Sequence, residues 1–192
     1  MKTIWKTGMA LALVAAMLGM LPAQGEAAAD AWGDPKTMVG KPAPEIVLPL
    51  AGGGEFKLSE LKGKKNVVLD FWGTWCPWCR KSTEQFLKLR DEYAGKDVEF
   101  YLVAVLDNEK AVIDYFTKEK ITAKALLDTN RKAADPYWVD PVPHAVVIDK
   151  EGIVRSVAIG EDKTAPSIRE TLEKLYAKSA PEASSSEAKP AE

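Results

Sequence analysis

The two cysteines of this chain are three positions apart, in the segment Cys76-Pro77-Trp78-Cys79. Cysteines at this spacing can close a small disulfide ring when oxidised and form a dithiol when reduced. If a helix begins here, its free N–H groups and its dipole favour the thiolate of Cys76 and lower the pKa of that thiol. Pro77 suits the first turn of such a helix because proline has no N–H group to leave unpaired. The pattern therefore predicts a redox pair, in which Cys76 attacks a partner disulfide and the more buried Cys79 breaks the resulting mixed disulfide.

Other interpretations of the pair stay open at this point. A structural disulfide is the usual fate of paired cysteines in an exported chain, although a ring this short restricts the unfolded chain little. The spacing also fits half of a zinc site, but the sequence contains no second Cys-x-x-Cys. A third interpretation is a metal-binding module, in which Cys76, Cys79 and the lone histidine, His144, form a thiolate–imidazole site for Cu(I) or zinc.

The N-terminal segment indicates where the chain works. Lys2 and Lys6 precede an uncharged apolar run over residues 8–21, and small residues lead up to Ala29. A charged start, a short apolar centre and small residues are typical of a secretory signal. The run is short for a membrane-spanning helix, which needs about 20 apolar residues, so an N-terminal anchor is the alternative. We interpret residues 1–29 as a signal peptide or an N-terminal membrane anchor and expect an extracytoplasmic protein: secreted, periplasmic or held at the outer face of the cell membrane.

Length and composition suit one globular domain with extensions, since the chain has 192 residues and 46% of them are hydrophobic. The 26 basic and 28 acidic side chains give a net charge of −2, which excludes a basic nucleic-acid footprint and argues against electrostatic binding to a membrane. Residues 179–192 contain no large apolar side chain, so we interpret them as a disordered tail. The folded domain should span residues 38–178, and the lack of long exposed apolar runs favours a monomer.

Apolar runs predict the strands that must position the cysteines. Val67–Trp72 is nearly continuously apolar, as is typical of a strand covered on both faces, and Val98–Leu106 has the same character. Two later strands, residues 145–148 and 153–159, are joined by a four-residue turn. Near the N-terminus, alternating residues on either side of three glycines predict a hairpin over residues 46–58. Its proline, Pro49, confines it to a sheet edge or to an irregular strand, and a short helical turn follows it.

Three helical patterns lie between and after these strands. The first follows Cys76 and has one buried stripe, and the second contains the apolar positions 112, 113 and 116. The third runs through residues 168–176, with Thr164 as its predicted cap and Pro166 in its first turn. The stripe of the first helix comprises Cys79, Ser82, Phe86, Leu89 and Tyr93. This order of strands and helices predicts an α/β fold, with a mixed sheet sandwiched by helices in three layers.

Three stretches together resemble a known family: VGKPAPEIVLPL, LKGKKNVVLDFWGTWCPWC and PVPHAVVIDKEGIV. Over residues 39–176 the chain is similar to extracytoplasmic thioredoxin-family proteins of the TlpA/ResA type. The resemblance implies a thioredoxin fold with an added N-terminal β-hairpin and a central insertion around residues 108–126. It also implies dithiol–disulfide exchange with other proteins, with no cofactor other than the redox-active disulfide Cys76–Cys79.

The resemblance also implies roles for single residues. Pro143 stands where the family has a cis-proline facing the dithiol, and the backbone of Val142 would pair with an extended partner segment. Asp70, inside an apolar strand, matches the buried acid of thioredoxins. Burial should raise its pKa, so that it relays a proton to and from Cys79. The alternative for Asp70 is an ordinary carboxylate at the end of a strand.

Two tryptophans flank the nucleophile, and two features depart from the family pattern. We expect Trp75, Pro77 and Trp78 to contact the substrate, with core packing as the alternative for the tryptophans. Ser82 occupies the position, three residues after Cys79, at which this branch often has a glutamate, so Asp70 would take over its proton handling. The dipeptide Pro77-Trp78 is closer to a glutaredoxin pattern, which leaves the direction of electron flow open.

The function expected from these residues is thiol–disulfide exchange outside the cytoplasm. We expect a reductant of disulfides in exported proteins, for example apocytochromes c, supplied by a membrane electron donor of the thiol–disulfide type. The alternative within the same chemistry is a disulfide oxidase or isomerase. A peroxiredoxin is a weaker alternative than the metal-binding module, because GTWCPWC lacks the cysteine placement that its chemistry needs.

Overall fold

The computed structural model describes residues 33–179, so the predicted signal peptide or anchor and all but the first residue of the predicted tail lie outside the described residues. A mixed sheet of five strands lies at the centre, in the order β5-β4-β3-β6-β7. Strands β3, β4 and β5 are parallel, whereas β6 and β7 are antiparallel to their neighbours. The strands are β3 (Asn66–Trp72), β4 (Val98–Val105), β5 (Ala125–Asp128), β6 (His144–Ile148) and β7 (Val154–Ile159).

The central strand β3 is buried along its whole length, as its continuous apolar run predicts. Because side chains alternate along a strand, Val68 and Trp72 join one apolar cluster, and Leu69 and Phe71 join another on the opposite face. Asp70, between Leu69 and Phe71 in the sequence, therefore points to the same face as Val68 and Trp72.

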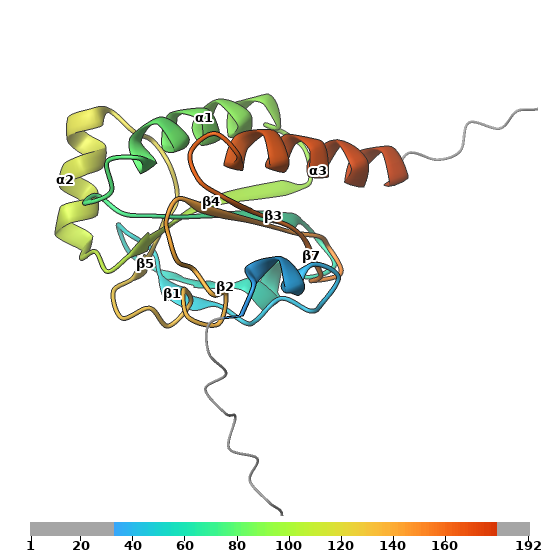
Figure 1. Cartoon of the computed structure of the whole chain (residues 1–192). Coiled ribbons are helices and arrows are strands. Elements are labelled where there is room, and N and C mark those ends of the chain that lie inside the picture. The colour runs from blue at the N-terminus through green and yellow to red at the C-terminus, as the bar shows by residue number, and fades with distance from the viewer. Residues whose placement is uncertain (1–32, 180–192) are drawn as a thin grey trace, which may run out of the picture. The chain divides into compact units, whose positions relative to one another are not determined.

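The longer helices pack on the face to which Asp70 points. Figure 1 shows α1 (Cys79–Glu92) and α3 (Thr164–Ser179) side by side over the sheet, and α2 (Glu109–Glu119) contributes Val112 to the same apolar cluster. All five residues of the predicted stripe on α1 are buried, which confirms that prediction. Within residues 33–179, no helix combines the length and the apolar character needed to cross a bilayer.

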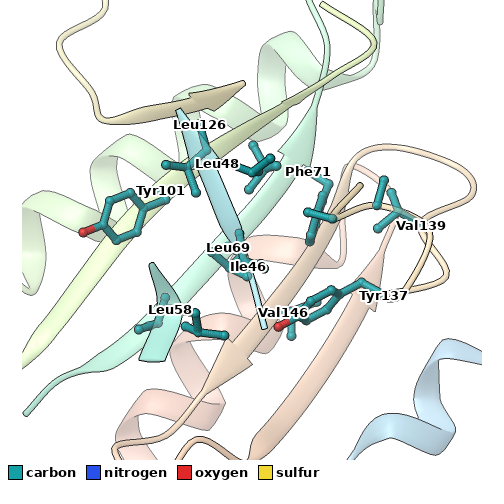
Figure 2. Packing of buried hydrophobic residues seen from close by; sticks show 14 of the residues in the cluster. Ile46, Leu48, Leu58, Leu69, Phe71, Tyr101, Leu126, Tyr137, Val139 and Val146 are labelled. Atoms are coloured by element: carbon teal, nitrogen blue, oxygen red, sulfur yellow. The ribbon is translucent and has the colours of Figure 1, made fainter. Parts of the chain in front are cut away.

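The opposite face is covered by the predicted hairpin, which consists of β1 (Val47–Pro49) and β2 (Glu55–Lys57). Two short 3-10 helices accompany it, η1 (Pro35–Met38) and η2 (Leu58–Leu61). Figure 2 shows Ile46 and Leu48 of this layer packed beside Leu69 and Leu126 of the sheet. The segment between β5 and β6 adds Tyr137, Val139 and two alanines to the same cluster.

Two local features differ from the sequence prediction. The segment expected as a central insertion forms α2 and the start of β5, and β5, a strand that was not predicted, pairs with β4 in parallel. Its run of four residues is too short for periodicity to distinguish it from a loop. The first helix begins at Cys79, so Pro77 lies in the turn before α1 and not in its first helical turn.

Candidate functional site

The cysteines lie where β3 ends and α1 begins. They form a disulfide with a Cα–Cα distance of 5.4 Å, and the segment that carries Cys76 is the loop between these two elements. Cys79 is more buried than Cys76, with 1% of its surface exposed against 7%. This order agrees with the predicted roles, in which a partner reaches the sulfur of Cys76 and Cys79 remains behind it.

The start of α1 supplies a hydrogen bond to the outer sulfur. The backbone N–H of Cys79 donates to Sγ of Cys76 at 3.1 Å. The same N–H also donates to the backbone oxygen of Cys76 at 3.3 Å, so it is shared between two acceptors. Because it lies at the positive end of the helix dipole, it favours a thiolate on that sulfur when the pair is reduced. Although α1 begins two residues later than a helix that directly follows Cys76, its first N–H group lies within hydrogen-bond distance of Sγ of Cys76. The lowered pKa of the Cys76 thiol stays a prediction.

Asp70 is completely buried on the face of the sheet that holds the dithiol. Neither carboxylate oxygen has a hydrogen-bond partner among the described residues. Burial disfavours the charged form and raises the pKa of Asp70 to about 8, the direction predicted from the sequence. The carboxyl group is therefore neutral over much of the physiological range and can exchange a proton near neutrality. Its role as the proton relay for Cys79 stays a prediction.

A second loop, residues 140–143, meets the dithiol from the side of β6. The Val142–Pro143 bond is cis, as the resemblance implied, and so is the Asp140–Pro141 bond, which was not predicted. Sγ of Cys76 lies 3.9 Å from the backbone oxygen of Val142. We call residues 140–143 the Pro143 loop; pairing of the Val142 backbone with a partner segment stays a prediction.

The two tryptophans are exposed, which disfavours the core-packing alternative for both of them. Trp75 is 54% exposed and Trp78 is 69% exposed, and Pro77 between them is exposed too. The indole N–H of Trp75 donates to the backbone oxygen of Val105 at the end of β4, at 3.0 Å. An added Cβ on Gly73 would lie 2.5 Å from that indole nitrogen, so only glycine lets Trp75 lie across the loop in this way. Contact of these side chains with a substrate stays a prediction.

Asp107 is a residue of the site that sequence reasoning missed. Its carboxylate accepts hydrogen bonds from the backbone N–H of Thr74 at 2.7 Å and from the hydroxyl of Thr74 at 2.8 Å. These bonds fasten the loop that carries Cys76 to the end of β4. One signal was available, because a polar residue directly after a parallel strand lies at the same edge of the sheet as the end of the neighbouring strand.

Ser82, the residue in place of the family glutamate, is buried one helical turn after Cys79. Its hydroxyl lies 2.9 Å from the hydroxyl of Thr164, which is also buried. The prediction of Thr164 as a cap is wrong, because Thr164 is the first residue of α3 and its hydroxyl pairs with Ser82. The position of the family glutamate therefore holds a neutral hydroxyl group, and the hydroxyls of Ser82 and Thr164 form a hydrogen bond with each other.

The structure overturns the alternative of a metal site made by Cys76, Cys79 and His144. His144 is paired with Phe71 across the sheet and contacts its ring, so it points to the hairpin face, away from the dithiol. Among residues 33–179 no group of three metal-ligating side chains of the His, Cys, Asp or Glu type lies close enough to hold a metal ion. Burial lowers the pKa of His144 to about 4, so the ring is neutral at physiological pH.

Comparison with known proteins agrees with this geometry. Residues 38–175 match the family model described as Redoxin. The thiol-disulfide oxidoreductase ResA of Bacillus subtilis (strain 168) is 36% identical over 121 residues, which cover 63% of this chain and 67% of that protein. ResA of Bacillus thuringiensis (strain Al Hakam) is 34% identical over 126 residues, which cover 66% of this chain and 72% of that protein.

A solved structure extends the likeness to three dimensions. The thioredoxin domain of a thiol-disulfide oxidoreductase from Bacteroides vulgatus superposes with a TM-score of 0.61 and 26% identity. The match covers 69% of this chain and 96% of that domain. The fold, the buried dithiol at the end of β3 and these relatives lead to one conclusion: the chain belongs to the Redoxin family and is a thioredoxin-like thiol–disulfide oxidoreductase of the ResA type.

Proposed function

We propose that this oxidoreductase works outside the cytoplasm and reduces disulfides in exported proteins, with apocytochromes c as one substrate. In this proposal a membrane electron donor of the thiol–disulfide type returns the dithiol to its reduced state. The charged and apolar pattern of residues 1–29 supports the location. The observation that carries the substrate class is the disulfide itself, because both cysteines are buried and Sγ of Cys76 lies 3.9 Å from the backbone oxygen of Val142 in the Pro143 loop.

The reaction follows from the order of burial. The thiolate of Cys76 attacks one sulfur of the partner disulfide and forms a mixed disulfide, and the other partner sulfur leaves as a thiolate that takes up a proton. Cys79 then loses its proton to Asp70 in its ionised, carboxylate form, and its sulfur attacks Sγ of Cys76. The second partner sulfur leaves and is protonated. Two electrons have passed to the partner, and the Cys76–Cys79 disulfide has formed.

The charges around the sulfurs support the direction from enzyme to partner. A strong oxidant needs a reduced form that is stabilised, as nearby cations would do for a thiolate. Here Pro77 and Trp78, between the cysteines, carry no charge, and His144 is neutral on the opposite face of the sheet. Asp70, the buried acid on the dithiol face, would oppose a thiolate when ionised. These features favour a low reduction potential, whereas the N–H of Cys79 and the cationic Arg80 next to it in the sequence act in the opposite direction.

Trapping of mixed disulfides tests the location and the substrate class together. The Cys79→Ser variant, expressed with its native leader, should accumulate mixed disulfides through Cys76, because the resolving thiol is absent. After acid quenching, the trapped proteins should be exported chains that carry cysteine pairs. The matched control is the double variant Cys76→Ser/Cys79→Ser, which should trap none. Trapped proteins that are exclusively cytoplasmic would contradict the proposal.

A further inference from the structure

Helix α1, which begins at Cys79, is linked to the Pro143 loop by contacts other than the one between Cys76 and Val142. The backbone N–H of Gly160, directly after β7, donates to the backbone oxygen of Pro143 at 2.9 Å. Four residues later α3 begins, and the N–H of Thr164 donates to the backbone oxygen of Gly160 at 3.3 Å. Gly160 has a φ of +98°, a conformation that favours glycine. The start of α3 is therefore fixed to the loop that borders Cys76.

The same short segment is attached to α1. The hydroxyl of Thr164 pairs with that of Ser82 at 2.9 Å, and both residues are more than nine-tenths buried. Next to Ser82, Lys81 forms ion pairs with Glu161 at 2.7 Å and with Asp162 at 3.1 Å. Lys81 and Asp162 are largely exposed, so these pairs contribute little on their own. The buried hydroxyl pair is the specific tie between α1 and the start of α3.

Together these contacts close a ring around the dithiol. Cys79 and Ser82 lie one turn apart on the buried face of α1, and Ser82 leads through Thr164 and Gly160 to Pro143. On the other side of the ring, Sγ of Cys76 lies 3.9 Å from the backbone oxygen of Val142. We call the separation between Sγ of Cys76 and the backbone of Val142 the gap of this ring.

We propose that Ser82 and Thr164 are positioning residues, whose buried hydroxyl pair sets the gap between the dithiol and the Pro143 loop. Neither side chain has to touch the reacting sulfurs in this role. Without the pair, α3 can shift against α1, and the hydrogen bond from Gly160 to Pro143 passes that shift to the loop. Exchange with a polypeptide disulfide depends on the width of the gap, whereas exchange with a small disulfide reagent does not. The proposal rests on the thiol–disulfide exchange activity and holds for either direction of electron flow.

The chemistry of paired hydroxyls allows positioning to be separated from stability. Removing one hydroxyl leaves a buried polar group without its partner, which destabilises the fold. Removing both hydroxyls leaves an apolar pair, which is nearly neutral for stability. The single variants Ser82→Ala and Thr164→Val should therefore be less stable than the double variant Ser82→Ala/Thr164→Val. Positioning, in contrast, is lost in all three variants.

The test measures two rates on the purified full-length chain and its variants, together with urea denaturation. One rate is the kcat/KM for reduction of insulin disulfides, and the other is the rate constant for reaction of the reduced dithiol with dithionitrobenzoate. We expect the double variant to regain its stability but to keep a kcat/KM for insulin about tenfold below the wild-type value, through a raised KM, since small displacements of reacting groups lower rates steeply. Its rate with the small reagent should stay within about twofold of wild type.

Two control variants sharpen the result. Thr164→Ser keeps the hydroxyl and should keep the wild-type rates. Thr171→Val removes a hydroxyl from the same helix, one that donates to the backbone oxygen of Ser167, and should leave both rates unchanged. The proposal is overturned if the double variant recovers both stability and kcat/KM, or if the two rates fall equally. A high reduction potential would contradict the proposed reductant and leave this positioning role intact.

Discussion

Asp70 and His144 lie on adjacent strands and are buried to the same extent, yet the sheet separates them. Neither side chain has a hydrogen-bond partner among the described residues. Asp70 points to the face that carries α1 and the dithiol, and His144 points to the hairpin face, where it meets the ring of Phe71. Burial acts on both in the same way, because it favours the neutral form: it raises the pKa of Asp70 to about 8 and lowers that of His144 to about 4.

The difference shows that a perturbed pKa alone does not identify a functional group in this molecule. Both residues have one, but only Asp70 shares its face of the sheet with the sulfurs. Strand alternation decides which buried group can take part in exchange, since neighbouring residues on a strand point to opposite faces. Changes made on the two faces should therefore have separable effects on rate and on stability.

The largest effect should come from the cysteines on the dithiol face. Cys76→Ser removes the attacking thiolate, so reduction of insulin disulfides should fall to the uncatalysed background. Cys79→Ser keeps the thiolate of Cys76 that attacks the partner disulfide but lacks the thiol that breaks the mixed disulfide. This variant should therefore form a stable mixed disulfide and not turn over. Both rates are followed by insulin turbidity. An unchanged rate in Cys76→Ser would show that another group is the nucleophile.

The comparison is sharpest when each buried ionisable group is replaced in turn. Asp70→Asn removes the proton acceptor, so release of the mixed disulfide should slow by about 100-fold or more, as is typical of lost general acid–base catalysis. In the wild type this rate should rise as pH increases through about 8, and the inflection should vanish in Asp70→Asn. Stopped-flow mixing over a range of pH measures it.

The matched variant on the other face is His144→Leu, because leucine is similar in size to histidine and has no ionisable group. Its exchange rate should stay within about twofold of wild type over the same pH range, because His144 faces the ring of Phe71 and not the sulfurs. A loss comparable to that of Asp70→Asn would break the distinction between the two faces.

Stability should depend on pH with opposite signs for the two groups. The folded chain keeps the proton of Asp70 up to about pH 8, whereas the unfolded chain releases it near 3.8, so the free energy of unfolding falls as pH rises between these values. For His144, the unfolded chain binds a proton below 6.5 and the folded chain only near 4, so the free energy of unfolding falls as pH drops between these values.

In the wild type these slopes oppose each other between about pH 4 and 6.5, and single variants should expose each one. Asp70→Asn should gain stability as pH rises through this window, and His144→Leu should lose it, each by up to about 1.4 kcal/mol per pH unit. Urea denaturation of the oxidised proteins at several pH values measures both. Parallel curves for the two variants would contradict the assignment.

The smallest effect should be purely structural and lie on the hairpin face. The hydroxyl of Tyr137 donates to the backbone oxygen of Pro44 at 2.7 Å. Tyr137→Phe should lower the free energy of unfolding by about 1 kcal/mol, the usual contribution of one such hydrogen bond. The exchange rate should not change, and a reduced rate would show that the hairpin face influences the dithiol.

Much of this arrangement could be predicted from the sequence, because the sheet and helices follow periodicity. Strand β3 and the buried stripe of α1 carry unbroken patterns, and they place Cys76 and Cys79 where the structure has them. The bond between Thr74 and Asp107 joins residues 33 positions apart, and the one between Ser82 and Thr164 spans 82. Sequence periodicity does not predict contacts between residues so far apart in the chain, since it depends on neighbours within a turn or a strand. The alternative that placed His144 beside the cysteines failed because the direction of this side chain depends on where β6 begins.

The reduction potential of the Cys76–Cys79 couple tests the central claim, that this dithiol face is built to donate electrons, most directly. The purified chain is equilibrated in thiol–disulfide buffers and the fraction of reduced cysteine is counted by alkylation. We predict a value of about −230 to −270 mV, near the thioredoxin end of the range. A value of about −120 to −180 mV would mean that the reduced form is strongly stabilised, and would contradict a reductant in favour of an oxidase or isomerase.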